Sequence, residues 1–359
     1  MLPARATAPD SAVRATDSDA LVSRASAAAL GYLDDPAAAL FLSPQQRRAH
    51  ERRPPLINIG THARTWATDR LVDHFLARFA QVGPTQVLSL GAGTDTRFWR
   101  TRASYQARAR DWSCARWVEV DFPEATAAKA RTIASKPQLR DALGGDLKVE
   151  HGGLGLSSPL YALLPGDIRA LPALAASLLS PSASSSSPDA PLSPALPTLL
   201  LLECVAVYLA PSDTDALLAW FAQTWGRDSG PGGAVVMYDP FGLDDAFGAV
   251  MKRNLAARAL ALPGAAATPT LASLSERLRR AGARGAVGAR SVRDIRESCL
   301  TADECERVAR IEQIDEVEEL NLVLEHYAVS WANLQPSSKG AEGGAGGRGA
   351  EIGLADAEP

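Results

Sequence analysis

The stretch Gln86-Val-Leu-Ser-Leu-Gly-Ala-Gly-Thr-Asp-Thr-Arg-Phe-Trp99 decides the fold, because an apolar strand pattern runs directly into Gly91-Ala-Gly93 and then into the start of a helix. Glycines here let the backbone turn tightly and approach a ligand, and the following helix offers unpaired N–H groups. A plain strand-to-helix turn has the same pattern. Thr96 replaces the third glycine of the dinucleotide fingerprint, which favours a nucleoside ligand without a pyrophosphate over NAD.

Outward from this stretch, short β-rich runs alternate with helical patterns, which is typical of an α/β doubly wound sheet. The strands are expected at 86–90, 116–120, 160–164, the first part of 197–208 and 233–238, with an antiparallel edge strand at 328–334. The helices are expected at 65–79, 123–134, 214–225, 244–260 and 315–327. The segment before the first strand is largely helical in pattern and is expected to cap the carboxyl ends of the strands, where such sheets bind ligands.

Composition indicates one catalytic domain over residues 19–335, with the helical cap at about 19–80. Residues 1–18 and the Gly-rich residues 336–359 are expected to be disordered tails. The Ser/Pro run at 180–197 lies between Leu-rich segments and is therefore expected to be an insertion in a surface loop.

The bulk numbers exclude several classes of protein. Hydrophobic residues make up 46% of the chain, and the mean hydropathy of −0.06 is ordinary for a globular protein. A net charge of −4 without a basic face disfavours nucleic acid as a partner. We find no membrane span or secretory leader and expect a cytoplasmic, monomeric protein. The four cysteines form no CxxC pair, so neither a disulfide framework nor a metal site is expected.

Three carboxylates stand at or just after the ends of apolar runs. Asp121 ends Trp-Val-Glu-Val-Asp and is as well suited to accept both ribose hydroxyls of a nucleoside as to cap the next helix. Asp167 follows the run at 160–164. Glu203 ends Leu-Leu-Leu-Leu-Glu, where burial is costly unless the carboxylate meets a partner, either a nearby arginine or a ligand ammonium group.

Arg64 is expected at a helix start that faces the ligand edge of the sheet. An arginine there can clamp a carboxylate with two hydrogen bonds, although most arginines are merely solvated. His62, His74 and His326 have no partners at triad or metal-ligand spacing and are interpreted as structural.

Taken together and in order, these segments resemble the leucine carboxyl methyltransferases from Asp17 to Trp331. The resemblance rests on PPLINIGTHAR, LSLGAGTDTRFWR, VEVDFPEATAAKA, GDIRAL, PTLLLLECVAVYLAP and RIEQIDEVEELNLVLEHYAVSWA. It implies a class I S-adenosylmethionine-dependent methyltransferase with added N-terminal helices. It also implies methylation of the C-terminal leucine carboxylate of the protein phosphatase 2A catalytic subunit.

The resemblance implies a cofactor contact for each matching position on the nucleoside side. Gly91 and Gly93 form the glycine loop against the cofactor, and Asp121 holds the ribose hydroxyls. Asp167 and Ile168 meet the adenine.

At the methionine end of the cofactor, the same resemblance assigns the carboxylate to Arg64 and the ammonium group to Glu203. Arg24 stands where the family has a lysine and would clamp a carboxylate of cofactor or substrate. Two further departures are Thr61-His62 in front of Ala63-Arg64, and Tyr238-Asp239-Pro240 in place of Tyr-Glu-Gln.

This chemistry requires no acid or base, because an α-carboxyl group has a pKa of roughly 3.5 and is already ionised at neutral pH. Arg24 and Arg64 are therefore positioning groups. Two alternatives remain at this point. One is a related O-methyltransferase acting on a tRNA wybutosine side chain or a small acid, and the other is a non-catalytic regulator that binds the cofactor.

Overall fold

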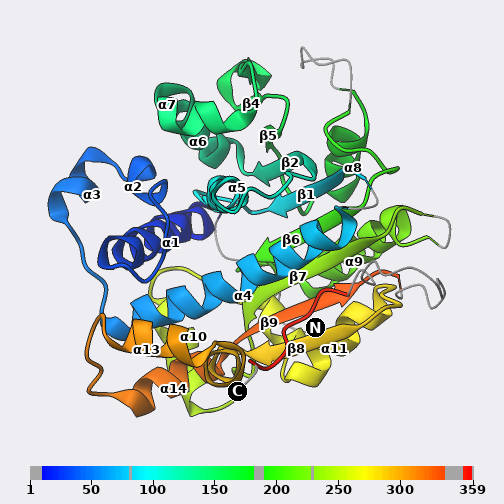
Figure 1. The fold of residues 1–359 in the computed structure, drawn as a ribbon. Helices are drawn as coiled ribbons and strands as arrows, with labels where there is room; N and C mark the ends of the chain where they lie inside the picture. Colours follow the sequence, from blue (N-terminus) through cyan, green and yellow to red (C-terminus); the bar gives the residue numbers. More distant parts are fainter. Residues whose placement is uncertain (1–9, 81–82, 182–189, 228–229, 336–350, 358–359) are drawn as a thin grey trace.

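The computed structural model describes residues 10–80, 83–181, 190–227, 230–335 and 351–357, and Figure 1 shows their arrangement. A single mixed sheet has the strand order β3-β4-β5-β2-β1-β6-β7-β9-β8. The strands are β1 (Thr85–Leu90), β2 (Cys114–Asp121), β3 (Lys148–Glu150), β4 (Gly155–Ser157), β5 (Tyr161–Pro165), β6 (Thr198–Glu203), β7 (Gly233–Pro240), β8 (Val287–Ser291) and β9 (Tyr327–Asn333). The predicted α/β fold with an N-terminal helical region is confirmed.

Helices cover both faces of the sheet. One face is packed by α4 (Pro55–Phe79), α5 (Arg97–Ala107) and α6 (Pro123–Ser135), and the other by α8 (Leu171–Leu179), α9 (Pro211–Trp225) and α11 (Leu271–Arg280). The remaining α-helices are α1 (Asp10–Leu30), α2 (Ala38–Phe41), α3 (Pro44–Ala49), α7 (Pro137–Arg140), α10 (Ala246–Ala256), α12 (Val292–Asp294), α13 (Ala302–Ala309) and α14 (Val317–Glu325).

Alternation along the central strands builds the two cores. In β1, Val87 packs with α4 and α5, whereas the next residue, Leu88, packs on the opposite face with α8 and α9. Successive side chains of a strand point to opposite faces, so β1, which has apolar residues on both faces, must be covered on both. Its polar residues Thr85, Gln86 and Ser89 are buried as well.

The five central strands β5-β2-β1-β6-β7 are parallel, whereas β9 runs antiparallel to β7. The prediction that residues 328–334 form an antiparallel strand is right in direction but wrong in placing it at the edge, because β8 pairs with its outer side. The run Val-Gly-Ala-Arg-Ser of β8 has no apolar alternation to reveal it. Its Gly288 lies beneath the ring of Trp331, where a Cβ would come within 2.6 Å of Cε2.

The predicted tails differ from the structure at both ends. Helix α1 begins at Asp10, so residues 10–18 are helical rather than disordered. Asp10 forms an ion pair with Arg169, and Asp17 binds the glycine loop, so contacts with distant segments order this stretch. At the other end, Ile352 and Leu354 are buried in the core despite the Gly-rich composition around them. Residues 1–9 and 336–350 lie outside the described residues.

Helix α4 begins ten residues before the predicted start at Thr65 and is part of the sheet layer rather than of the cap. Gly60 and the β-branched residues before Arg64 lower helix propensity, but contacts with α1, α14 and β7 override it. Of the Ser/Pro run, residues 182–189 lie outside the described part. Leu192, which belongs to the same run, is buried in the core rather than exposed in a surface loop. In the part of the chain that the structure describes, no helix is long and apolar enough to cross a membrane.

Candidate functional site

The register of three neighbouring strands brings the predicted acidic residues to the glycine loop. Leu90 of β1 pairs with Val120 of β2 on one side and with Leu202 of β6 on the other. Because these strands are parallel, the next residues, Gly91, Asp121 and Glu203, lie side by side at the carboxyl edge of the sheet. This is the edge at which open α/β sheets bind ligands.

Both glycines of the loop have left-handed backbone conformations, with φ of +66° at Gly91 and +44° at Gly93. A Cβ at Gly91 would come within 2.6 Å of Val205 Cγ2, in the segment after β6. At Gly93 the position that a Cβ would occupy is taken by the carboxylate of Asp17 from α1. That carboxylate also accepts hydrogen bonds from the N–H and the hydroxyl of Thr94, both at 2.8 Å. The loop therefore needs glycine because other segments pack closely against it.

Asp121 is held by the same loop. Its Oδ2 accepts a hydrogen bond from Gly93 N at 2.7 Å, and its Oδ1 accepts one from Phe122 N at 2.6 Å. Burial raises the pKa of this carboxyl group, and the two N–H groups counteract part of that increase. A carboxylate has about four lone-pair sites, so two remain for ligand hydroxyls.

Asp167 and Ile168 follow β5, which pairs with β2 so that Asp121 lies opposite Pro165. Both residues therefore follow β5 at the same edge of the sheet as Asp121. The Asp167 side chain is 37% exposed and forms an ion pair with Arg169, whose hydrogen bond lowers the pKa of Asp167. Ile168 is half-buried against the core on the α8 side.

Arg64 and Glu203 form an ion pair in which Arg64 Nε donates to Glu203 Oε1. The guanidinium also lies over the ring of Tyr238, 4.4 Å from its centroid. Burial alone would raise the pKa of Glu203, but Arg64 and Arg97 outweigh it and lower the pKa to about 2. Arg64 thus reaches the predicted edge, although it lies inside α4 and not at a helix start.

Arg24 reaches the same region from α1. Its Nη2 donates to the carbonyl oxygen of Thr94 at 3.0 Å, and its Nη1 lies 3.7 Å from Asp95 Oδ1. Its Nε is buried without a hydrogen-bond partner among the described residues. The same Nε lies 4.0 Å from Asp35 Oδ2, so Arg24 fastens α1 both to the glycine loop and to the α1–α2 connection.

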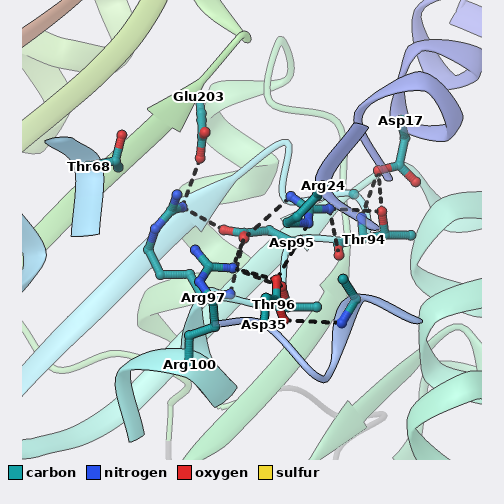
Figure 2. Close-up of polar contacts among 12 residues, drawn as sticks. Asp17, Arg24, Asp35, Thr68, Thr94, Asp95, Thr96, Arg97, Arg100 and Glu203 are labelled. Carbon is teal, nitrogen blue, oxygen red and sulfur yellow. Dashed lines mark hydrogen bonds and ion pairs between the residues drawn. The ribbon is translucent and has the colours of Figure 1, made fainter. Parts of the chain in front are cut away.

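Sequence reasoning missed a buried ion cluster beneath the loop, which Figure 2 shows. Arg97 donates to Asp95 Oδ2 at 2.6 Å, to Asp69 Oδ1 at 2.6 Å and to Glu203 Oε2 at 2.8 Å. Arg100 adds bonds to Asp69 and Asp35, and so extends the cluster to the α1–α2 connection. One feature of the sequence indicates it: Arg97 begins a helix, where the positive helix end disfavours a cation that has no anionic partners.

A second set of buried polar side chains, from α6, β2 and β5, contacts the glycine loop. Lys129 of α6 donates to the carbonyl oxygen of Asp95 at 2.8 Å and to Glu119 Oε2 at 2.5 Å, and Tyr161 donates to the same carboxylate oxygen at 2.6 Å. Burial raises the pKa of Glu119 against the opposing effect of Lys129. These contacts tie the glycine loop to β2 two residues before Asp121.

Comparison with known proteins identifies the family of this chain. The family model for leucine carboxyl methyltransferase matches residues 12–222. Leucine carboxyl methyltransferase 1 of Cryptococcus neoformans (strain JEC21) is 46% identical over 74% of this chain and 77% of its own length. The Bos taurus protein of the same name is 31% identical over 76% of this chain and 75% of its own length. This chain belongs to the leucine carboxyl methyltransferase family. It is therefore a methyltransferase enzyme. Among solved structures, the magnesium protoporphyrin IX methyltransferase of Synechocystis PCC 6803 aligns with a TM-score of 0.39 and 10% identity over 81% of this chain and 87% of that chain.

One departure from the resemblance, Asp239, lies beside this site. Glu203 is followed by Cys204 with a φ of +56°, and the N–H of Cys204 donates to the carbonyl oxygen of Tyr238 at 2.6 Å. Asp239 Oδ1 then accepts from Val207 N at 3.1 Å. Burial raises the pKa of Asp239 to about 7. Asp239 therefore supports the segment after β6 that packs against Gly91.

A groove of about 1110 Å³ lies beside the ion cluster, between the α1–α2 connection, α4 and α5. Asp35, Asp69 and Arg100 line it, but Gly91 and Glu203 do not, so it is separate from the edge described above. Among the residues that the structure describes, no group of three or more His, Cys, Asp or Glu could hold a metal ion.

Proposed function

We propose that this methyltransferase uses S-adenosylmethionine to methylate the C-terminal leucine α-carboxylate of the protein phosphatase 2A catalytic subunit. The observation that carries the cofactor assignment is the Arg64–Glu203 pair beside the glycine loop. A cation and an anion from different elements meet there, which complements the carboxylate and ammonium groups of a free amino acid. The leucine carboxylate is supported by the names of the relatives, and the phosphatase by the sequence resemblance.

The residues at the edge fit this cofactor over its whole length. Asp121 retains two acceptor positions for ribose hydroxyls, and Asp167 with Ile168 offers a polar and an apolar contact for the base. At the other end, the low pKa keeps Glu203 anionic at neutral pH, so it can accept hydrogen bonds from an ammonium group. Arg24 lies close to the loop, and its buried Nε, which has Asp35 Oδ2 at 4.0 Å but makes no hydrogen bond, suits a carboxylate.

Bound here, S-adenosylmethionine would supply an electrophilic methyl group. The chain's own residues then have two tasks, because the leucine carboxylate is already ionised and needs no base. The first is to hold the carboxylate and the cofactor in line, which is worth roughly 7 to 11 kcal/mol of barrier in favourable cases. The second is to exclude water, a task suited to α1, whose Asp17 and Arg24 bind the loop directly.

The substrate is tested with methyl-labelled S-adenosylmethionine and the phosphatase 2A core enzyme, either intact or lacking its terminal leucine. We expect label on the intact catalytic subunit only, and its release by mild base, because a methyl ester is base-labile. Label on the truncated subunit, or no label on either, would contradict the assignment.

The cofactor site is tested with Asp121→Ala. This change removes the ribose acceptor and should weaken binding of S-adenosylhomocysteine about tenfold or more in calorimetry. Thermal unfolding checks that the variant remains folded. Unchanged affinity in a folded variant would refute the role of Asp121.

A further inference from the structure

We propose that Arg97 is a positioning residue for the methionine end of the cofactor, acting through Glu203. The inference rests on the proposed function and goes beyond it by assigning a role to a residue that does not itself touch the cofactor in our scheme. It starts from the way in which Glu203 shares its two carboxylate oxygens between two arginines.

Glu203 Oε1 accepts from Arg64, and Glu203 Oε2 accepts from Arg97 at 2.8 Å. The two arginines differ in exposure: the Arg97 side chain is 2% exposed and the Arg64 side chain is 23% exposed. Arg64 is therefore the one that can turn toward a ligand. Arg97 is enclosed by protein.

Arg97 is also fixed by two further anions. Its Nε donates to Asp69 of α4, and its Nη1 donates to Asp95 of the loop, each at 2.6 Å. A planar guanidinium that is bound by three carboxylates from three elements has a single available orientation. Figure 2 shows Arg97 between Glu203 and Asp95.

The fixed position of Arg97 matters because the proposed cofactor contacts would otherwise leave Glu203 without a protein cation. When Arg64 turns to the cofactor carboxylate, Glu203 loses one of the two arginines that keep its pKa low, until the ammonium group of the cofactor takes that place. A buried carboxylate without a cation becomes protonated and stops accepting hydrogen bonds from an ammonium group. Because Arg97 stays in place, it keeps the Glu203 carboxylate ionised and oriented toward the ammonium group. The other groups that face Glu203 are Asp95, which opposes ionisation, and the neutral side chains of Tyr238 and Cys204.

The experiment compares S-adenosylhomocysteine with adenosine, which lacks the amino-acid end. Arg97→Lys should weaken binding of S-adenosylhomocysteine about ten- to a hundredfold and change adenosine binding by less than about threefold, as measured by calorimetry. Adenosine binding also reports that the variant is folded. Arg100→Lys is the matched control: Arg100 lies one turn further along α5, pairs with Asp69 and Asp35, and should leave the ratio of the two affinities unchanged.

A double-mutant cycle tests the path through Glu203. In a Glu203→Gln background, Arg97→Lys should weaken S-adenosylhomocysteine binding no further. Additive losses, or equal losses for both ligands, would overturn the proposal and make Arg97 a structural residue only. If Arg97→Lys does not fold, Asp69→Asn removes one anchor of Arg97 and should selectively weaken S-adenosylhomocysteine about three- to tenfold; no selectivity there also overturns it. A wild-type protein that binds adenosine but not S-adenosylhomocysteine would instead refute the proposed cofactor.

Discussion

Replacing Asp239 by asparagine should remove a large pH dependence of stability from this protein. Asp239 is 6% exposed, and its Oδ2 has no hydrogen-bond partner among the described residues. Burial raises the pKa of this carboxyl group from 3.8 to about 7. Asparagine keeps the oxygen that accepts from Val207 N but carries no charge at any pH.

The direction of this pH dependence follows from which state, native or unfolded, binds the proton at residue 239. Between about pH 4 and pH 7 the unfolded chain is ionised at residue 239, whereas the native chain keeps the proton there. The native state therefore binds more protons, and the contribution of Asp239 to stability falls as pH rises through this window. A pKa difference of about 3 corresponds to about 4 kcal/mol in total, of which about 2.5 kcal/mol is lost between pH 5 and pH 8.

The assay is urea unfolding of the wild type and Asp239→Asn at pH 5, 6, 7 and 8, with the free energy of unfolding compared at each pH. All other titrating groups are common to both proteins, so their contributions cancel in the difference. We expect the variant to gain about 2.5 kcal/mol relative to the wild type from pH 5 to pH 8. A difference that stays constant from pH 5 to pH 8 would refute the raised pKa, because an Asp239 that is ionised and paired in the native state titrates below this range in both states.

Two further substitutions test the packing around the site and the C-terminal segment. Gly91→Ala should cost about 2 kcal/mol or more in urea unfolding, because φ is +66° and the new Cβ meets Val205 Cγ2 at 2.6 Å. Gly31→Ala, at φ +90° with nothing within 4 Å, should cost only about 1 kcal/mol, and equal costs would argue against the clash. Ile352→Ala should cost about 2–4 kcal/mol, because Ile352 is 1% exposed. Leu322→Ala, at a position that is 46% exposed, should change stability by at most about 0.5 kcal/mol, and a similarly small effect at Ile352 would show that residues 351–357 do not contribute to the core.

The parts of the fold that could be predicted from the sequence are those in which the local hydrophobic pattern matches the burial seen in the structure. The apolar run before Gly91 predicts a central strand, and β1 is buried along its whole length. Glu203 could be singled out because a carboxylate that ends an apolar run must find a partner, and the structure supplies one in Arg64. The start of α4 could not be read in the same way, because Gly60 and its β-branched neighbours favour other conformations and only packing makes them helical.

The ion cluster shows why site residues are harder to predict than strands. Asp95 and Arg97 stand in the stretch that decides the fold, yet nothing local to it shows that Asp69 of α4 will pair with Arg97, or that Asp35 of the α1–α2 connection will pair with Arg100. Each of these charges is tolerable only because the others are present, since a single buried charge without partners is strongly destabilising. Such a cluster is a property of the assembled elements, and it can form only when α1, α4, the glycine loop and β6 are all in place. Arg24 of α1 reaches this cluster through Asp95, so the position of α1 and the alignment of Glu203 depend on the same set of ion pairs.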